Sequence, residues 1–500
     1  MSVARKLVGQ TAAYGLSTII GRAITYLLVP IYTAIFAPAE LGVQVVLYAY
    51  VAFFNILFTY GMETAYFRFA NKPGADRQHL YNHVMSLLLV TSAVFTGLLL
   101  LFSDQIAELV GYPQYPEYVR WLAWVLGIDA VAAIAFARLR LENKAIRFAT
   151  IRLFNIFLTV GANIFFLVIC RNIYQGDYLQ QLRPLIQYIY DPELGVGYIF
   201  LINLGANLLL LPFFWRQFTT FKFKIDKELL RPMLVYAYPL MFMGLAGMVN
   251  EVLDRILLKS YLPENFYQGL SNEAVVGIYG NCYKLAIFMS LAIQAFRYAA
   301  EPFFFSQAQE KNSPATFALI MKWFVIACAF IFLFISANLE DFALLLRRES
   351  YRQGIMVVPV LLMANLFLGV YYNLSVWFKL TDKTHYGTFI SFGGAAVTIL
   401  LNLLLIPVIG YFGAAFTTLA CYFSMALASY VLGQKYFPVP YPVKTMAAYV
   451  LAAVALAAAA LYVPVSDFWL RHAWHLLLCI TFVAIIWIKE RPSFPMLRKR

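Results

Sequence analysis

The residues NEVLDRILLKSYLPENFYQGLSNEAVVGIYGNCYKLA, numbers 250–286, open the second half of the chain. They form two apolar segments joined by a polar turn, and charged side chains interrupt both segments. These side chains are Glu251, Asp254, Arg255 and Lys284. A charge inside a membrane-spanning segment is costly, and such residues usually serve transport or bind a ligand. The stretch therefore indicates a membrane protein with ionisable groups within its spans.

The composition of the whole chain is that of a polytopic membrane protein. Of its 500 residues, 62% are hydrophobic and 13% are charged, whereas soluble proteins have about 45–50% and about 25%. A net charge of +13 would suggest a nucleic-acid partner in a soluble protein, but here the basic residues lie between hydrophobic segments. We therefore attribute this charge to membrane topology and expect no nucleic-acid partner.

The apolar segments predict an all-α fold with 14 transmembrane helices, because a spanning helix needs about 20 apolar residues. The first apolar run continues to Phe36 without a small-residue cleavage site, so we interpret it as a retained helix and not as a signal peptide. The predicted spans are residues 12–36, 43–66, 82–102, 119–139, 150–170, 196–215, 233–258, 275–297, 316–337, 354–378, 386–407, 411–432, 444–463 and 471–488.

The basic residues also predict the orientation of the spans. Loops and flanks on the side of the N-terminus hold 27 of the 38 Lys and Arg residues, those on the opposite side hold 8, and the rest lie within spans. Because Lys and Arg concentrate in cytoplasmic loops, both termini are predicted to be cytoplasmic.

An internal repeat relates the two halves of the chain. With an offset of 235, Leu41-Gly42-Val43 aligns with Val276-Gly277-Ile278, and Tyr48 aligns with Tyr283. An even number of spans per repeat makes the repeat parallel. The prediction is therefore a six-helix lobe at 1–216, a second six-helix lobe at 217–435, and two further helices with a basic cytoplasmic tail at 436–500. Such repeats place a substrate site near the bilayer midplane between the lobes.

Two stretches carry a resemblance to a known family. The segment at 250–286 and NLLLIPVIGYFGAAFTTLACY at 402–422 resemble bacterial polysaccharide and oligosaccharide flippases of the multidrug/oligosaccharidyl-lipid/polysaccharide exporter superfamily. Over most of residues 1–435, this resemblance implies a flippase that moves a polyprenyl-diphosphate-linked oligosaccharide from the cytoplasmic to the outer leaflet of the bacterial cytoplasmic (inner) membrane. The sugar would serve O-antigen, capsule or exopolysaccharide assembly, in company with membrane lipids and other polysaccharide-assembly proteins.

Two alternatives remain open at this point: a cation-coupled multidrug exporter of the same superfamily, and a membrane-embedded polysaccharide polymerase or ligase. The chain has no Gly-rich phosphate loop, so we do not expect it to hydrolyse nucleotides. Its soluble stretches are too short for a glycosyltransferase domain, so we expect a transporter without a cofactor in preference to an enzyme. His79 and His83 have the spacing of a metal pair but lack a nearby third ligand, which favours a solvated helix face. The five cysteines lie singly in apolar segments and are interpreted as core residues.

In the first lobe, Asp129 and Arg22 are the charges nearest the bilayer centre. Asp129 lies nine residues from both Arg120 and Arg138, and Arg22 lies ten residues into the first predicted span. One interpretation is an ion pair that orders the lobe. The other is functional: Asp129 titrates or binds a coupling cation, H⁺ or Na⁺, while Arg22 meets the substrate.

In the second lobe, Glu251 and Arg255 share a helix face and Lys284 lies at a comparable depth, which allows a local charge network. The functional hypothesis assigns Arg255 and Lys284 to substrate binding, and Glu251 and Asp254 to coupling.

Four further arginines are predicted at cytoplasmic helix ends, where they would dock the diphosphate at the entrance. Anionic lipid headgroups would attract the same residues, so positive-inside topology is the competing explanation. These residues are Arg68, Arg138, Arg140 and Arg297.

Overall fold

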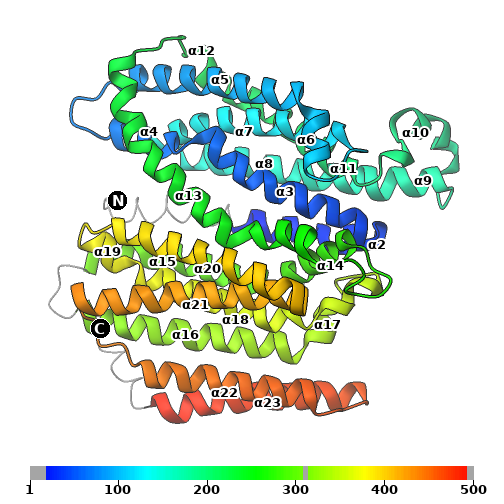
Figure 1. Ribbon diagram of the computed structural model, residues 1–500, viewed down its shortest axis with the longest axis vertical. Helices are drawn as coiled ribbons and strands as arrows, with labels where there is room; N and C mark the ends of the chain where they lie inside the picture. The colour runs from blue at the N-terminus through cyan, green and yellow to red at the C-terminus, as the bar shows by residue number, and fades with distance from the viewer. Residues whose placement is uncertain (1–18, 308–312, 492–500) are drawn as a thin grey trace. The chain divides into compact units, whose positions relative to one another are not determined.

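A computed structural model describes residues 19–307 and 313–491, which fold into α-helices with a few short 3₁₀ and π segments (Figure 1). Residues 12–18 of the first predicted span and residues 492–500 of the basic tail lie outside the described part. The helices form two compact units, Met1–Gly280 and Asn281–Arg500. The first unit contains α2 (Leu28–Ile35), α3 (Pro38–Thr59), α4 (Met62–Ala70), α5 (Arg77–Leu101), α6 (Ser103–Leu109), α7 (Pro116–Leu141), α8 (Ala145–Ile164), α9 (Arg171–Gln175), α10 (Arg183–Ile189), α11 (Gly197–Leu210), α12 (Trp215–Thr219), α13 (Lys227–Tyr261) and most of α14 (Asn272–Leu285).

The remaining helices belong to the second unit. They are α15 (Ile287–Gln307), α16 (Ser313–Ala337), α17 (Leu339–Ala343), α18 (Val357–Leu374), α19 (Val376–Leu380), α20 (His385–Ile409), α21 (Tyr411–Tyr436), α22 (Val443–Tyr462) and α23 (Phe468–Glu490). Within this unit α21 packs against both α18 and α20, and α22 packs against α16. Small residues on α21 and α22, such as Ala414 and Ala453, are fully buried at these contacts and let the helices approach closely.

The all-α polytopic class is confirmed. Among the described residues, 12 helices are long and apolar enough to cross a membrane, or 13 if the bent pair Asn272–Leu285 and Ile287–Tyr298 is one span. The described part of the first predicted span, Ile19–Ile35, is a shorter apolar helix. The predicted total of 14 spans therefore remains a prediction, because the first predicted span is only partly described.

Helices α3 and α14, which the predicted repeat aligns, are each followed by a break, although the two breaks do not fall at equivalent positions of the repeat. Between α3 and α4 the chain passes through left-handed backbone conformations at Tyr60 (φ 31°) and Gly61 (φ 77°). Between α14 and α15 the helix axis bends by 45°. In the repeat, α3 aligns with α14, so both lobes would contain one discontinuous helix. Irregular backbone at membrane depth is tolerated where it is buried in protein or lines a cavity.

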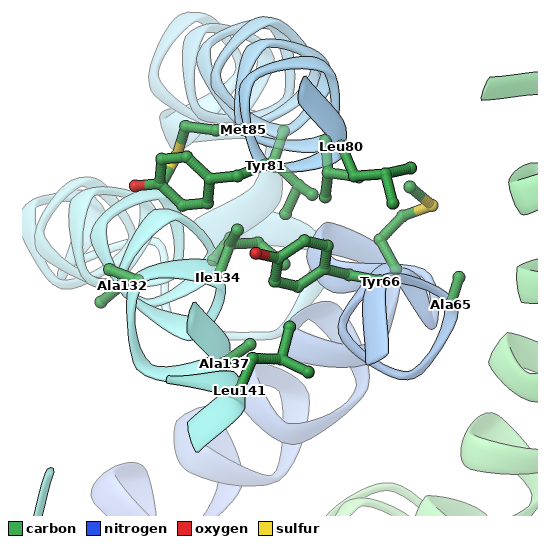
Figure 2. Close-up of a cluster of buried hydrophobic side chains, with 14 of the residues drawn as sticks. Ala65, Tyr66, Leu80, Tyr81, Met85, Ala132, Ile134, Ala137 and Leu141 are labelled. Carbon is green, nitrogen blue, oxygen red and sulfur yellow. The ribbon is translucent and has the colours of Figure 1, made fainter. Parts of the chain in front are cut away.

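The core of the first unit lies between α4, α5 and α7. Tyr66, Tyr81 and Met85 are buried there and pack around Ile134 and the small residues of α7 (Figure 2). Helix α13, which begins after the predicted first lobe, packs on α3 and α4 of the same unit. The first compact unit therefore extends beyond the six-helix lobe predicted at 1–216, and the lobe boundaries at 216 and 435 stay predictions.

Thiol labelling tests the predicted orientation. On a cysteine-free background, Gly176→Cys and Gln268→Cys should react with a membrane-impermeant thiol reagent in intact cells, whereas Gly74→Cys and Lys144→Cys should react only after lysis. The five native cysteines are free and buried, so their replacement removes background labelling. Labelling of Lys144→Cys or a cysteine at Lys383 in intact cells would contradict cytoplasmic termini.

Candidate functional site

A chain of amide side chains leads to Asp129 in the first unit. Asn207 of α11 donates from Nδ2 to Asp129 Oδ1 at 2.8 Å, and Asn155 of α8 donates from Nδ2 to Asn207 Oδ1 at 3.2 Å. Asp129 itself is partly exposed, whereas Asn207 is buried. Three helices distant in sequence thus bring polar groups to a carboxylate in the middle of an apolar span. Such groups can hold a proton or a cation at this carboxylate.

The cation that acts electrostatically on Asp129 is Arg152 of α8. Arg22 lies in the helical segment Ile19–Ile35 with its side chain exposed. Within the described residues, no hydrogen bond or ion pair joins Arg22 to Asp129. The structure therefore does not show the structural ion pair between these two residues. The functional hypothesis for each residue stays open.

The amides around Asp129 were missed when only charged residues were considered. Asn203, one turn before Asn207 on α11, donates to the Tyr48 hydroxyl at 2.8 Å, and Tyr48 lies close enough to Asp129 to interact with it electrostatically. The signal was present in the sequence, because Asn155, Asn203 and Asn207 are amides within predicted spans. Polar amides in spans commonly hydrogen-bond between helices.

A second carboxylate, Asp254 of α13, is buried and fully engaged. Its Oδ2 accepts a 2.6 Å hydrogen bond from the Tyr279 hydroxyl of α14, and its Oδ1 accepts from the Arg255 backbone N–H at 2.9 Å and from Arg255 Nη1 at 3.1 Å. Arg255 also donates to the backbone oxygen of Glu251, whose side chain is exposed. Arg255 therefore pairs with Asp254 and with the backbone of Glu251. These contacts make Asp254 a link between α13 and α14.

Lys284 belongs to the second unit and donates from Nζ to Asn281 Oδ1 at 3.1 Å, one turn earlier on α14. Its predicted role in substrate binding stays a prediction.

Helices α3 and α14 cross at two glycines with their backbones in contact. A Cβ atom added to Gly277 would lie 3.0 Å from the backbone nitrogen of Gly42 and would overlap the carbonyl oxygen of Pro38. A Cβ atom added to Gly42 would overlap the carbonyl oxygen of Glu273. Each glycine thus faces the carbonyl four residues before the other glycine. This reciprocity is what a local two-fold relation gives, and the predicted repeat aligns these same two glycines.

Lys259, near the C-terminal end of α13, makes further contacts within the first unit. Lys259 Nζ donates to the carbonyl oxygen of Val110 at 2.5 Å and lies 3.3 Å from the centroid of the Tyr112 ring. The side chain of Asn272 donates to the backbone oxygens of Lys259 and Leu262 at 3.2 and 2.8 Å. These contacts tie the loop between α6 and α7 to α13, close to the start of α14.

Two of the four predicted entrance arginines form hydrogen bonds or ion pairs with other side chains of the protein. Arg138 donates to Glu142 at 2.7 Å, to Gln78 at 2.7 Å and to Thr220 at 2.9 Å, and its guanidinium lies 4.3 Å from the centroid of the Tyr81 ring. Arg140 forms an ion pair with Glu63. These arginines connect α4, α5, α7 and the segment after α12.

The other two entrance arginines are exposed. The guanidinium of Arg68 lies 4.1 Å from the centroid of the Tyr236 ring, and that of Arg297 lies 4.0 Å from the centroid of the Tyr372 ring. Within the described residues, neither guanidinium makes a hydrogen bond or an ion pair. Both are therefore available to an anionic ligand, and the tyrosines restrict the rotamers of the arginines.

The described residues contain no group of three or more His, Cys, Asp or Glu side chains that could hold a metal ion. His79 and His83 contact each other, with Nε2 to Nε2 at 3.1 Å, as two residues one turn apart on α5.

Several solved transporters share this fold. The lipid II flippase MurJ in an inward closed conformation matches with a TM-score of 0.69 and 13% identity, covering 95% of this chain and 99% of that chain. An inward-facing multidrug resistance MATE family transporter of the MOP superfamily matches with a TM-score of 0.63 and 13% identity, covering 83% and 94%. The Vibrio cholerae MATE transporter VcmN matches with a TM-score of 0.58 and 15% identity, covering 86% and 96%. The chain thus shares the fold of these transporters.

Residues 31–175 match the family model described as polysaccharide biosynthesis protein. None of the curated protein sequences matches the chain. Over this segment the chain is similar to polysaccharide biosynthesis proteins.

Proposed function

We propose that this protein is a flippase that moves a polyprenyl-diphosphate-linked oligosaccharide from the cytoplasmic to the outer leaflet of a bacterial cytoplasmic membrane. The match of residues 31–175 to polysaccharide biosynthesis proteins, on a transporter fold, carries this proposal. The oligosaccharide serves O-antigen, capsule or exopolysaccharide assembly, together with other assembly proteins of that pathway. Both termini face the cytoplasm.

The chemistry of the substrate explains why a protein is needed. Moving a diphosphate through hydrocarbon requires desolvation of its charges, at a cost of several kcal/mol or more for each. A polar path between two lobes carries the head group, while the polyprenyl tail stays in lipid. Alternating access then exposes this path first to the cytoplasm and later to the outside. The contact between α3 and α14 at Gly42 and Gly277 supports this mechanism. Because no side chains interlock there, the two helices can separate and come together again without repacking.

Asp129 is the best candidate for coupling transport to H⁺ or Na⁺. It is partly exposed, it accepts a hydrogen bond from a neutral amide, and it has two further amides nearby on α8 and α11. Asp254, by contrast, is buried and bonded to Tyr279 and Arg255, so we assign it to the structure of the α13–α14 pair. Arg22 is exposed in its helix and remains our candidate for contact with the diphosphate.

Lipid analysis of a deletion strain tests the function. Loss of the protein should leave lipid-linked oligosaccharide in the cytoplasmic leaflet and remove the polymer from the cell surface, and plasmid expression should reverse both changes. An unchanged surface polymer together with new sensitivity to small amphipathic drugs would instead identify a multidrug exporter.

The entrance arginines separate into two pairs with different expected effects. Combined Arg68→Gln and Arg297→Gln should lower transport by about tenfold or more at a normal protein level, since each basic residue near an anionic headgroup contributes about 1 kcal/mol. Arg138→Gln should instead lower stability by about 1.5–3 kcal/mol, because it breaks hydrogen bonds that involve charged groups. Thermal unfolding and translocation assays on purified variants separate the two effects. Undiminished transport by the Arg68 and Arg297 double variant would refute the docking role.

A further inference from the structure

A cavity of about 770 Å³ opens in the first unit beside the start of α8. One wall is the turn between α7 and α8, in which Asn143 adopts a left-handed conformation with φ 57°. The other wall is the 3₁₀ segment η4 (Leu211–Phe214) and the first turn of α12. Both walls lie at the ends of candidate membrane spans, Ala145–Gln175 and Gly197–Thr219. The predicted orientation places this end of the spans at the cytoplasmic face.

The charges that line the cavity are all positive. They belong to Lys144, Arg147 and Arg216, and no acidic residue lines the cavity. Arg147 joins the two walls, because its Nη2 donates to the carbonyl oxygen of Phe213 at 2.8 Å. That bond uses one of the guanidinium donors and leaves the others for a ligand. Arg216 is exposed at the opposite wall.

Lys144 is the one cation of the three with an acidic partner. Its Nζ lies 2.5 Å from Glu142, which also accepts from Arg138 at 2.7 Å. Burial alone would raise the pKa of Glu142, but the hydrogen bonds from Lys144 and Arg138 outweigh burial and lower the pKa. Glu142 is thus held as a carboxylate between two cations and does not compete for Arg147 or Arg216.

Large apolar side chains stand at the mouth of the cavity. Ile146 is 81% exposed and Trp215 is 70% exposed. Phe213, which also lines the cavity, packs its ring against that of Phe154, with the centroids 4.6 Å apart. Tryptophan at the end of a span is typical of the boundary between headgroups and hydrocarbon. The cavity is therefore lined both by cations and by exposed apolar side chains suited to contact with acyl chains.

We propose that this cavity binds the headgroup of an anionic glycerophospholipid of the cytoplasmic leaflet. The phosphate lies between Arg147 and Arg216, Lys144 adds long-range attraction, and the acyl chains leave past Ile146 and Trp215. A soluble phosphate would gain nothing from the apolar mouth, whereas a phospholipid uses both parts of the site. The proposal does not depend on which substrate is carried.

Native mass spectrometry of the purified full-length protein tests this site. Phosphatidylglycerol should bind the wild type in preference to phosphatidylcholine with the same acyl chains. The triple variant Lys144→Gln, Arg147→Gln and Arg216→Gln should bind phosphatidylglycerol with at least about tenfold lower affinity. A matched control removes three exposed basic side chains that line no described cavity, through Lys222→Gln, Lys224→Gln and Lys227→Gln. This control should keep the affinity of the wild type.

A second variant guards against misfolding, because Arg147→Gln also removes the bond to Phe213. Arg216→Glu alone reverses one charge at an exposed position and should reduce phosphatidylglycerol binding several-fold at an unchanged melting temperature in neutral detergent. Equal loss of binding in the pocket and control variants would overturn the proposal, and so would binding that does not distinguish the two phospholipids. Displacement of phosphatidylglycerol by millimolar inorganic phosphate, or by polyprenyl diphosphate at far lower concentration, would assign the cavity to that ligand and also overturn it.

Discussion

Gly277→Leu is expected to abolish most transport while the protein still inserts into the membrane. Any side chain at this position overlaps the backbone of α3 at Pro38, and backbone cannot move aside as a flexible side chain can. Overpacking of a tight contact costs typically about 1–3 kcal/mol, which corresponds to about 5- to 150-fold in a conformational equilibrium. The crossed arrangement of α3 and α14 would lose population by that factor. Translocation of lipid-linked oligosaccharide in proteoliposomes, with thermal unfolding in parallel, measures the effect.

A matched glycine gives the control for this prediction. Gly247 of α13 is helical, and a Cβ atom added there meets nothing within 4 Å. Gly247→Ala should therefore leave transport unchanged and raise stability slightly, since alanine favours helix over glycine by about 1 kcal/mol. Gly42→Ala and Gly277→Ala combined should cost less than the sum of the single variants, because either methyl group already separates the two helices. Full additivity, or full activity of Gly277→Leu, would contradict a functional crossing.

Asp129→Asn is expected to reduce transport by on the order of tenfold or more at a normal protein level. Asparagine keeps the size of the side chain and can still accept from Asn207 Nδ2, so the local packing survives. What is lost is the group that can take up and release a proton or bind a cation. Transport driven by an imposed H⁺ or Na⁺ gradient should lose its dependence on that gradient in this variant.

Three companion variants identify the role of the charge. Asp129→Leu should lower the protein level as well as activity, because it leaves the buried Asn207 amide without its acceptor, at a cost of about 1–3 kcal/mol. Arg22→Gln should insert normally and transport poorly if Arg22 contacts the diphosphate. Exchange of the two residues, Arg22→Asp with Asp129→Arg, should rescue nothing, because the described residues show no bond between them. A gradient-dependent Asp129→Asn variant would remove Asp129 from the coupling mechanism.

The positions of the spans could be predicted from the sequence because hydrophobicity over about 20 residues is a local property. Each of the 12 candidate spans overlaps a predicted one, and the alignment of Gly42 with Gly277 marked the place where two helices meet. The ends of the helices were less predictable. The helix predicted at 233–258 extends over Lys227–Tyr261, since capping by Asp226 starts it in polar sequence where hydrophobicity carries no signal.

The partners of the charged residues were decided by the tertiary structure alone. Sequence spacing suggested Arg22 for Asp129 and Glu251 for Arg255, but the structure brings Asn207 and Arg152 to Asp129 and places Asp254 beside Arg255. The depth of a residue in the membrane follows from its position along one helix. The residue that it faces depends on how that helix is rotated and which helix packs against it, and Asn207 is 78 residues away from Asp129. The sequence by itself therefore determined the class of the protein and the depth of its charges, and only the packing of helices decided which polar groups meet.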